Sequence, residues 1–228
     1  MLRTVVNDRV DRGLAAACEE LSRLGVSTAY EALGATGLVD APLTRLLPGS
    51  RVAGPARTVR CGQDDNLMVH AVMERVRPGD VVVITMPEPR PVSLVGDLLA
   101  TQARLHGAAG LLVDAAVRDV DDLVELGLPV WCRFVRSTAA TKRLAGALDE
   151  PVTVGGARIE PGDVVVMDGD GAVVVPVARV AEVLAAARAR AEREVRVREQ
   201  LRAGHLTLDL HGLRRLVADG GAASREGA

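Results

Sequence analysis

Aromatic side chains are almost missing from this sequence. Tyr30, Trp131 and Phe134 are the only ones among its 228 residues. Surfaces that bind RNA or single-stranded DNA usually combine basic residues with several stacking rings, and three scattered rings cannot build such a platform. The net charge of −2 and the sequence pI of about 6.1 also give no general attraction to a phosphate backbone. Together these observations argue against nucleic acid as a direct ligand.

Cysteine is scarce as well, and no stretch is suited to crossing a membrane. Cys18, Cys61 and Cys132 form an odd set without CxxC spacing, which argues against both a disulfide framework and a zinc site. No segment reaches about 18 uncharged apolar residues, and residues 1–12 are rich in charge. The sequence therefore predicts a cytoplasmic protein that does not bind membranes.

Several common catalytic motifs are absent too. The sequence has no GxGxxG, P-loop, HExxH or GxSxG pattern, and its four histidines share no metal-ligand spacing. Lys142 is the only lysine, so a Schiff-base aldolase would depend on it. Its polar context, STAATKR, does not predict the desolvated pocket that such an amine needs. A Schiff-base mechanism is therefore the least favoured of the enzymatic hypotheses.

Aliphatic residues, by contrast, are abundant and occur in strand and helix patterns. With 48% hydrophobic residues, a chain of 228 residues can bury the core of one α/β domain. Alternation and buried apolar runs predict strands at 51–61, 81–84, 111–114 and 129–134, and hairpins over 152–159 and 164–176. Helical spacing predicts helices at 14–24, 28–33, 66–76, 97–106, 120–126 and 180–202. Ser27 is expected to cap the second helix, and the chain beyond Ala218 is expected to be disordered.

The first candidate for a ligand site is the start of the helix at 97–106. Gly96 at the N-cap has no side chain to occupy the free amides of Leu98 and Leu99. Free amides at the positive end of a helix dipole suit a carboxylate or an oxyanion. The plain alternative is an ordinary glycine cap followed by Asp97 as an ordinary first-turn acid.

The second candidate is the pair Arg118 and Asp119, which follows a buried strand. Open α/β sheets place their ligands beyond the carboxyl ends of strands. The alternative is that Asp119 simply caps the helix at 120–126, with Asp122 in its first turn, and that Arg118 forms an ion pair there.

Taken together, the two candidates supply a guanidinium, two carboxylates and two backbone donors, provided that neighbouring strands carry them. A carboxylate with waters can hold Mg²⁺, and the metal can polarise a 2-oxo acid. An arginine can stabilise the oxyanion of an enolate. This combination favours enolate chemistry on a small 2-oxo acid.

At these residues the sequence resembles the RraA-like family, which includes the 4-hydroxy-4-methyl-2-oxoglutarate and 4-carboxy-4-hydroxy-2-oxoadipate aldolases. The resemblance rests on EALGATG at 31–37, GSRVAGPARTV at 49–59, DN at 65–66, PGDVVVI at 78–84, GDLLATQARLHGAAGLLVDAAVRDVDDLVELGLPV at 96–130 and PGDVVVMDGDGAVVVP at 161–176. It implies a swivelling β/β/α single domain over 1–202 with a long C-terminal helix, a C-terminal extension over 203–228, and assembly as a homotrimer or homohexamer.

The resemblance also implies roles for individual residues. Arg118 would bind the pyruvyl oxygens, Asp119 would hold Mg²⁺ or Mn²⁺, and Asp97 would orient a metal-bound water. The substrate carboxylate would lie at Gly96 and the amides of Leu98 and Leu99. Glu194 resembles the acid that aldolase members contribute from an adjacent subunit. The segment 134–146 departs from a family segment richer in glycine, which concerns substrate specificity.

The resulting hypothesis is a metal-dependent lyase that cleaves a 4-hydroxy-2-oxo di- or tricarboxylic acid to pyruvate and a second oxo acid, with oxaloacetate decarboxylation as a companion activity. The alternative is a non-catalytic regulator that binds a protein, since some family members inhibit ribonuclease E by contact.

Overall fold

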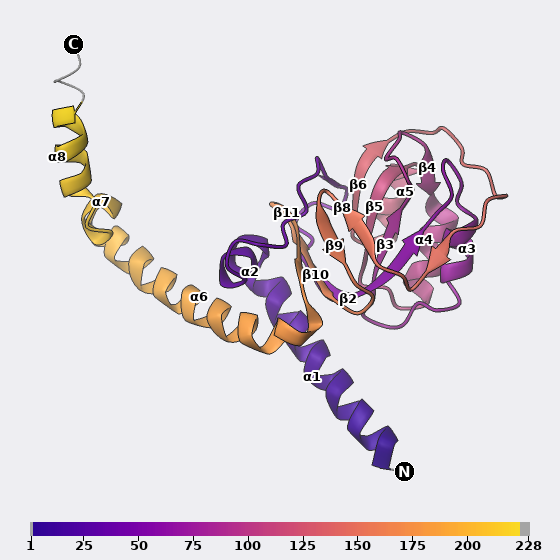
Figure 1. Ribbon diagram of the computed structural model, residues 1–228, viewed down its shortest axis with the longest axis horizontal. Coiled ribbons are helices and arrows are strands. Elements are labelled where there is room, and N and C mark those ends of the chain that lie inside the picture. Colours follow the sequence, from indigo (N-terminus) through magenta and orange to yellow (C-terminus); the bar gives the residue numbers. More distant parts are fainter. Residues whose placement is uncertain (1, 224–228) are drawn as a thin grey trace. The chain divides into compact units, whose positions relative to one another are not determined.

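The computed structural model describes residues 2–223, with side chains from residue 12 to residue 218. The chain divides into two compact units, Met1–Ala187 and Arg188–Ala228, and the boundary falls inside helix α6. The helices are α1 (Leu2–Leu24), α2 (Val26–Ala32), α3 (Leu67–Val72), α4 (Asp97–Leu105), α5 (Val120–Leu126), α6 (Val180–Arg202), α7 (Thr207–Leu210) and α8 (Arg214–Ala223) (Figure 1). A short 3-10 turn, η1 (Val177–Arg179), precedes α6.

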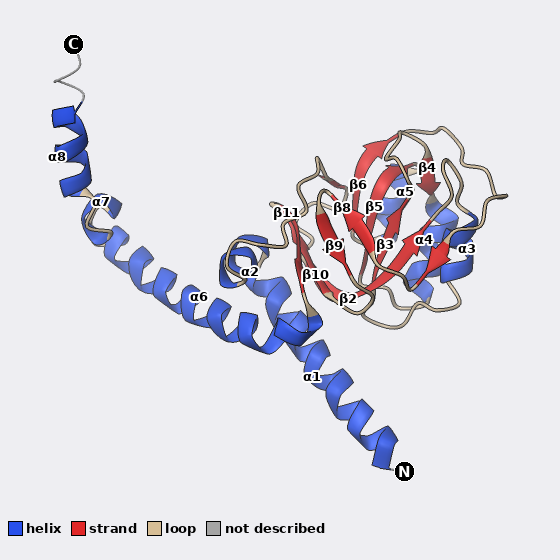
Figure 2. Ribbon diagram, in the orientation of Figure 1, coloured by secondary structure: helices blue, strands red, loops and turns tan. Residues whose placement is uncertain are grey.

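The first unit is organised around a mixed sheet with the strand order β1-β6-β5-β3-β2-β10-β11 (Figure 2). Its strands are β1 (Thr44–Arg45), β2 (Val52–Arg60), β3 (Val81–Thr85), β4 (Ser93–Val95), β5 (Gly110–Val117), β6 (Val130–Val135), β7 (Ala147–Leu148), β10 (Val164–Asp168) and β11 (Gly171–Val175). Strands β2, β3, β5 and β6 are parallel neighbours, whereas β10 joins β2 in the antiparallel sense. A separate hairpin consists of β8 (Val152–Val154) and β9 (Ala157–Ile159).

Aliphatic side chains fill three cores, one on each side of this sheet and one beneath the terminal helices. The first packs α3, α4 and α5 against β2, β3 and β5 through residues such as Val69, Ala100 and Val113. The second lies between the other face of the sheet and the β8–β9 hairpin, and it contains Trp131. The third covers the outer face of β10 and β11 with α1, α2 and the start of α6. The expected α/β fold with a long helix at 180–202 is confirmed, and its sheet is curled.

Most of the elements expected from sequence patterns are present, but several bounds differ. Helix α1 begins at Leu2 instead of residue 14, and α3 ends at Val72 instead of residue 76. Helix α2 begins after Gly25, whose φ of 86° and ψ of 172° end α1, and the hydroxyl of Ser27 donates to Asp170 instead of capping the helix. Helix α8 extends to Ala223, so the backbone of 219–223 is helical where we expected disorder, while 224–228 lie outside the described residues. Residues 168–171 form the expected hairpin turn between β10 and β11.

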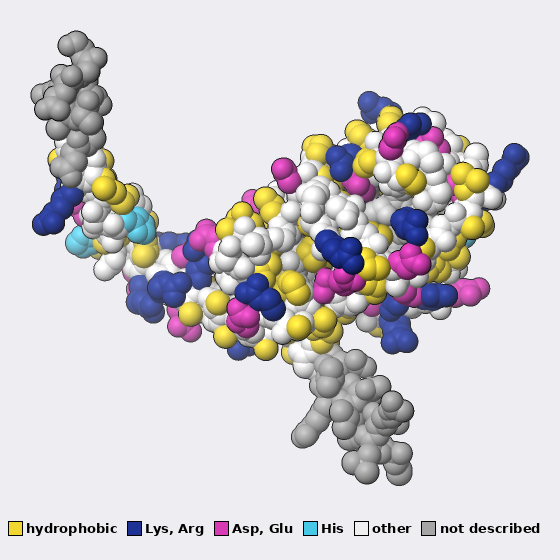
Figure 3. All heavy atoms as spheres, in the orientation of Figure 1, with side chains coloured by type: hydrophobic (Ala, Val, Ile, Leu, Met, Phe, Trp, Pro, Cys, Tyr) yellow, Lys and Arg dark blue, Asp and Glu magenta, His cyan; other side chains and the backbone are white. Residues whose placement is uncertain are grey.

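On the face shown in Figure 3, basic and acidic side chains of the first unit are interspersed, and neither sign of charge forms a large patch. No helix in the described part of the chain is long and apolar enough to cross a membrane.

Candidate active site

The site lies where β4 and β5 end side by side. These strands are parallel, and Val95 is paired with Val117. Gly96 and Arg118 are the next residues, so the chain leaves the sheet at two adjacent points and enters α4 and α5. The amide of Arg118 donates to the carbonyl of Val95 at 3.1 Å. The two candidate segments from the sequence therefore meet at one edge of the sheet.

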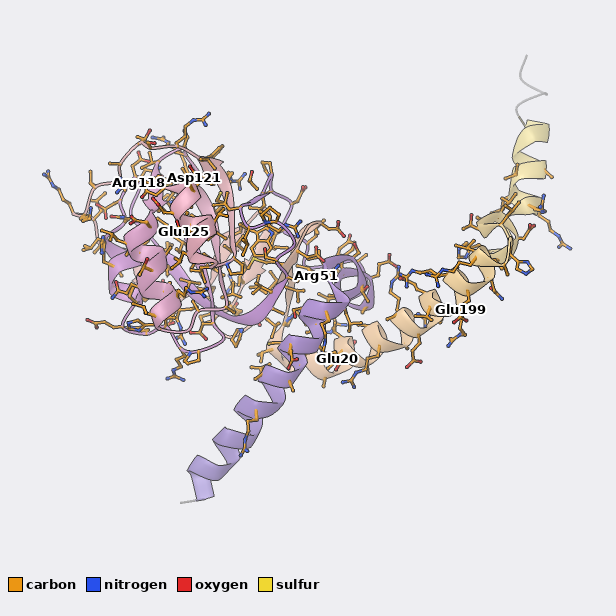
Figure 4. The ribbon with its side chains drawn as sticks, turned by 180° about the vertical axis from the view of Figure 1, so that it is seen from behind. Glu20, Arg51, Arg118, Asp121, Glu125 and Glu199 are labelled. Atoms are coloured by element: carbon orange, nitrogen blue, oxygen red, sulfur yellow. The ribbon has the colours of Figure 1, made fainter. Side chains whose placement is uncertain are left out.

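Asp119 connects the two segments through its side chain. Its Oδ2 accepts a hydrogen bond from the amide of Asp97 at 3.2 Å, and the Nε of Arg118 lies 3.4 Å from the same oxygen. Asp119 occupies the N-cap position of α5 with a left-handed backbone, φ 57° and ψ 46°, but makes no side-chain cap bond there. The carboxylate thus faces the start of α4, not its own helix. Figure 4 shows Arg118 together with Asp121 at the beginning of α5.

Gly96 permits this close approach. Its backbone is extended, so no unusual dihedral angle demands glycine. A Cβ at this position would lie 2.5 Å from Asp119 Oδ2 and 3.1 Å from Arg118 Nε. Glycine therefore lets the Asp119 carboxylate and the Arg118 guanidinium lie against the start of α4, and a side chain here would displace both groups.

A cavity of about 130 Å³ opens at this point. It is lined by Asn66, His70, Ser93, Gly96, Asp97, Leu98, Leu99, Arg118, Ala139, Ala140 and Lys142. Within the described residues, no hydrogen bond reaches the amides of Leu98 or Leu99, and the Leu98 side chain is 79% exposed. The first turn of α4 therefore offers two free donors and the positive end of a helix dipole to a small anion.

Sequence reasoning missed the opposite wall of the cavity, which consists of Asn66, His70, Ser93 and Lys142. Lys142 lines the cavity but is exposed, so the expectation that it lacks the desolvated pocket of a Schiff-base lysine stays a prediction. Burial, and then the positive charge of Lys142, lower the pKa of His70. The only signals in the sequence were the DN pair at 65–66 and the uniqueness of the lysine.

Asn66 carries an unsatisfied polar atom in this wall. Its Nδ2 donates to the carbonyl of Leu94 at 3.0 Å, which fixes the orientation of the amide. Its Oδ1 is buried and has no hydrogen-bond partner within the described residues, and the residue is only 8% exposed. A buried acceptor without a donor costs about 1–3 kcal/mol, so a group that enters the cavity with a donor would relieve this cost.

A divalent metal would find few protein ligands here. Among the described residues, no group of three or more His, Cys, Asp or Glu side chains could hold a metal ion. Mg²⁺ is commonly held by one or two carboxylates, with water and substrate completing its six ligands. Asp119 fits that pattern because one oxygen accepts the amide of Asp97 while Oδ1 has no recorded bond within the described chain. Asp119 would hold the ion, and Asp97 stands next to it.

Glu194 lies on α6 in the second unit. Its two oxygens form ion pairs with Arg190, at 3.0 Å, and Arg198, at 2.8 Å. Its expected role, as an acid lent to a neighbouring subunit, stays a prediction.

Comparison with known proteins agrees with this fold. Residues 24–174 match the model of the RraA-like family, described as Aldolase/RraA. The chain belongs to the RraA-like family.

Its relatives include both aldolases and regulators by name. A protein of Halalkalibacterium halodurans, provisionally named a 4-hydroxy-4-methyl-2-oxoglutarate aldolase, is 38% identical over 149 residues, which are 65% of this chain and 71% of the relative. The structure of Streptomyces coelicolor RraAS2, described as an unusual member of the RNase ES inhibitor RraA family, has a TM-score of 0.70 at 34% identity and covers 80% of this chain and 96% of its own. An uncharacterised protein of Pseudomonas syringae pv. tomato has a TM-score of 0.75 at 28% identity and covers 84% of this chain and 94% of its own. The similarity to a named aldolase supports an aldolase-type lyase.

Proposed function

We propose that this protein is a divalent-metal-dependent lyase that cleaves a 4-hydroxy-2-oxo acid by a retro-aldol reaction. The observation that carries the proposal is the hydrogen bond from the amide of Asp97 to the carboxylate of Asp119. This bond holds the start of α4, with its free amides, next to Arg118, and both line the same cavity. Carboxylate, guanidinium and helix amides are the groups that an enolate-forming reaction of a 2-oxo acid needs.

The residues divide the work according to their chemistry. The substrate carboxylate binds the amides of Leu98 and Leu99, and Arg118 faces the 2-oxo oxygen. The C4 hydroxyl loses its proton, the C3–C4 bond breaks, and C4 becomes the carbonyl carbon of the second oxo acid. The electron pair of the broken bond is delocalised onto the C2 oxygen, where Arg118 stabilises the negative charge. Protonation at C3 then gives pyruvate.

Asp97 and Asp119 supply the remaining functions. We assign Asp97 to orient a water that accepts the C4 hydroxyl proton. Asp119 would hold Mg²⁺ or Mn²⁺, which when bound supplies Lewis-acid polarisation of the 2-oxo acid. Oxaloacetate decarboxylation is expected as a second activity because loss of CO₂ from C3 leaves the same pyruvate enolate.

The direct test is pyruvate formation from a panel that contains 4-hydroxy-4-methyl-2-oxoglutarate, 4-carboxy-4-hydroxy-2-oxoadipate and oxaloacetate. We expect turnover with Mg²⁺ or Mn²⁺, and its loss with EDTA. Turnover on none of the panel, with the metal present and the protein folded, would argue against the lyase.

Glu194 is proposed to act as an acid in the site of an adjacent subunit of a homotrimer or homohexamer. Subunit mixing tests this proposal, because Asp119→Ala and Glu194→Gln would damage different halves of a shared site. Mixed assemblies of the two variants should recover a fraction of the activity that each lacks alone. If each variant stays inactive after mixing and exchange, a shared site is ruled out.

A non-catalytic regulator is the second candidate. The similarity to RraAS2, whose description names an RNase ES inhibitor family, favours it. A pull-down with an RNase E-type ribonuclease, followed by an inhibition assay, separates the two proposals. Inhibition without lyase turnover would put the regulator first.

A further inference from the structure

We propose that the buried ion pair between Asp114 and Arg133 positions the Arg118–Asp119 pair by fixing the register of β5, the strand that leads to it. The inference rests on the proposed lyase function and adds two positioning residues to it. Neither of the two is among the residues that line the cavity. The observation behind the inference is an irregularity in β5, shortly before Arg118.

Strand β5 contains one residue more than its neighbour β6 over the same stretch. Val113 and Ala116 pair with residues that are only two apart in β6, so β5 takes three steps where β6 takes two. Asp114 and Ala115 therefore both lie opposite Arg133, which is the arrangement of a β-bulge. Bulges bend the strand that contains them, and next to active sites they change the direction of the side chains that follow.

The bulge is also the point at which β5 changes its second neighbour. Before the bulge, β5 pairs with β3 as far as Val113, and after it β4 takes the place of β3, beginning at Ala116 (Figure 1). Only Ala116 and Val117 then separate the bulge from Arg118, whose amide donates to the carbonyl of Val95 in β4 at 3.1 Å. The position of the bulge thus decides which residue of β5 meets the end of β4.

The ion pair bridges β5 and β6 at this irregular step. Nε and Nη2 of Arg133 each lie 2.6 Å from Oδ1 of Asp114, and the two side chains are 18% and 5% exposed. Burial raises the pKa of the Asp114 carboxyl, and the bond from Arg133 opposes that rise. A buried ion pair adds little net stability compared with apolar side chains, and its best-attested use is to specify register. The place of this pair, across the bulge, fits that use.

A change of register here would reach Asp119, the proposed metal ligand. One residue of a strand spans about 3.3 Å, and a slip of one residue turns every side chain to the opposite face of the sheet. The hydrogen bond from the amide of Asp97 to Asp119 is 3.2 Å long, so it would not survive a shift of that size. Loss of the ion pair should therefore weaken metal binding at Asp119, in addition to any loss of stability.

Asp114→Asn and Asp80→Asn form a matched pair of variants for the test. The Asp80 side chain is also buried, at 7% exposed, and it accepts the Nε of Arg57 at 3.0 Å. It lies directly before β3, at the opposite end of the parallel strands from Arg118. Each substitution neutralises one buried carboxylate that is paired with an arginine, so the two differ chiefly in their distance from the site.

Three measurements are compared for the two variants: thermal unfolding, Mn²⁺ affinity by electron paramagnetic resonance, and pyruvate release from 4-hydroxy-4-methyl-2-oxoglutarate. Both variants should unfold at a lower temperature than the wild-type protein. We expect Asp114→Asn also to weaken Mn²⁺ binding and to lower kcat/KM, each by about 10- to 100-fold, the usual effect of disturbing a group that supports a metal ligand. Asp80→Asn should change Mn²⁺ affinity and kcat/KM by less than about twofold.

Arg133→Gln completes a double-mutant cycle and replaces Asp114→Asn as the test variant should the latter not fold. Alone it leaves a buried carboxylate without its cation, and Mn²⁺ binding should weaken over the same range. In the double variant an uncharged pair of amides spans the bulge, so Mn²⁺ affinity should recover above that of either single variant. Because affinity is measured at a temperature at which every variant is folded, a role in stability alone would not give this recovery.

The wild-type protein and Asp119→Ala separate failure of this inference from failure of the proposed function. Mn²⁺ binding that Asp119→Ala abolishes is binding at the site. If Asp114→Asn and Arg133→Gln bind that Mn²⁺ as tightly as Asp80→Asn does, the inference is overturned while the lyase proposal stands. If the wild-type protein releases no pyruvate and binds no Mn²⁺ that depends on Asp119, the lyase proposal fails, and the inference fails with it.

Discussion

Gly96→Ala tests whether the approach of α4 to Asp119 is essential to the site. The added Cβ would lie 2.5 Å from Asp119 Oδ2, whereas ordinary contacts begin near 3.4 Å. The carboxylate must therefore retreat by about 0.9 Å, the difference between these two distances, or α4 must shift by as much. Either movement would lengthen the 3.2 Å bond from the amide of Asp97. A misplacement of about 1 Å in an active site can cost on the order of 100-fold in rate, and that is the loss in kcat/KM we expect.

The assay is pyruvate release with saturating Mg²⁺, together with thermal unfolding to show that the variant is folded. Gly13→Ala is the matched control, because a Cβ at Gly13 meets nothing within 4 Å and its backbone is not in a left-handed conformation. It should keep full activity. A Gly96→Ala protein with wild-type kcat/KM and metal affinity would refute the reasoning, since it would show that the bond between the two segments has no part in catalysis.

Three further predictions follow from single residues. Arg118→Met should lower kcat by about 100- to 1000-fold with little change in stability, because it removes a donor to the developing oxyanion, and steady-state kinetics measures the loss. Burial raises the pKa of Asp65, but hydrogen bonds from Thr141 and from the amides of Leu67, Arg143 and Leu144 outweigh it and bring the pKa to about 2. A carboxyl whose pKa falls on folding stabilises the folded state above its unfolded pKa. Asp65→Asn should therefore lower the free energy of unfolding by about 2 kcal/mol at pH 7. Urea unfolding should show this difference shrinking as the pH falls from about 4 toward 2. Lys142→Met should raise the pKa of His70 toward its ordinary value, because it removes a nearby positive charge, while Arg136→Met should leave that pKa unchanged. NMR titration of His70 measures both. An unchanged pKa in Lys142→Met would mean that the lysine does not face the histidine.

The elements with strong periodicity could be predicted from the sequence because local patterns determine them. The helices at 120–126 and 180–202 begin and end where helical spacing indicated. The strand before Arg118 was predicted, but β4, the strand before Gly96, was not. That neighbouring strands carry the two segments was a condition of the hypothesis, and the pairing of Val95 with Val117 meets it. By contrast, residues 136–146 have no repeating pattern. Their position depends on the bonds to Asp65, more than 70 residues earlier in the chain, and no local signal predicts such a contact.

Ser27 illustrates the opposite error, in which a local signal was overruled. Its type and place suggested a helix cap, but the chain turns two residues earlier, at Gly25, and the amide of Val26 donates to Asp168 at 3.0 Å. The hydroxyl of Ser27 then bonds Asp170 at 2.7 Å. The β10–β11 turn therefore decides the start of α2, which requires knowledge of the tertiary fold.

The central claim is that the start of α4 and the Arg118–Asp119 pair form one metal-dependent catalytic site. The most direct measurement is pyruvate release from 4-hydroxy-4-methyl-2-oxoglutarate by the wild-type protein and by Asp119→Ala, each with Mg²⁺ and with EDTA. We predict turnover only by the wild-type protein with Mg²⁺. Turnover that persists in Asp119→Ala, or in the wild-type protein after complete chelation, would contradict the claim.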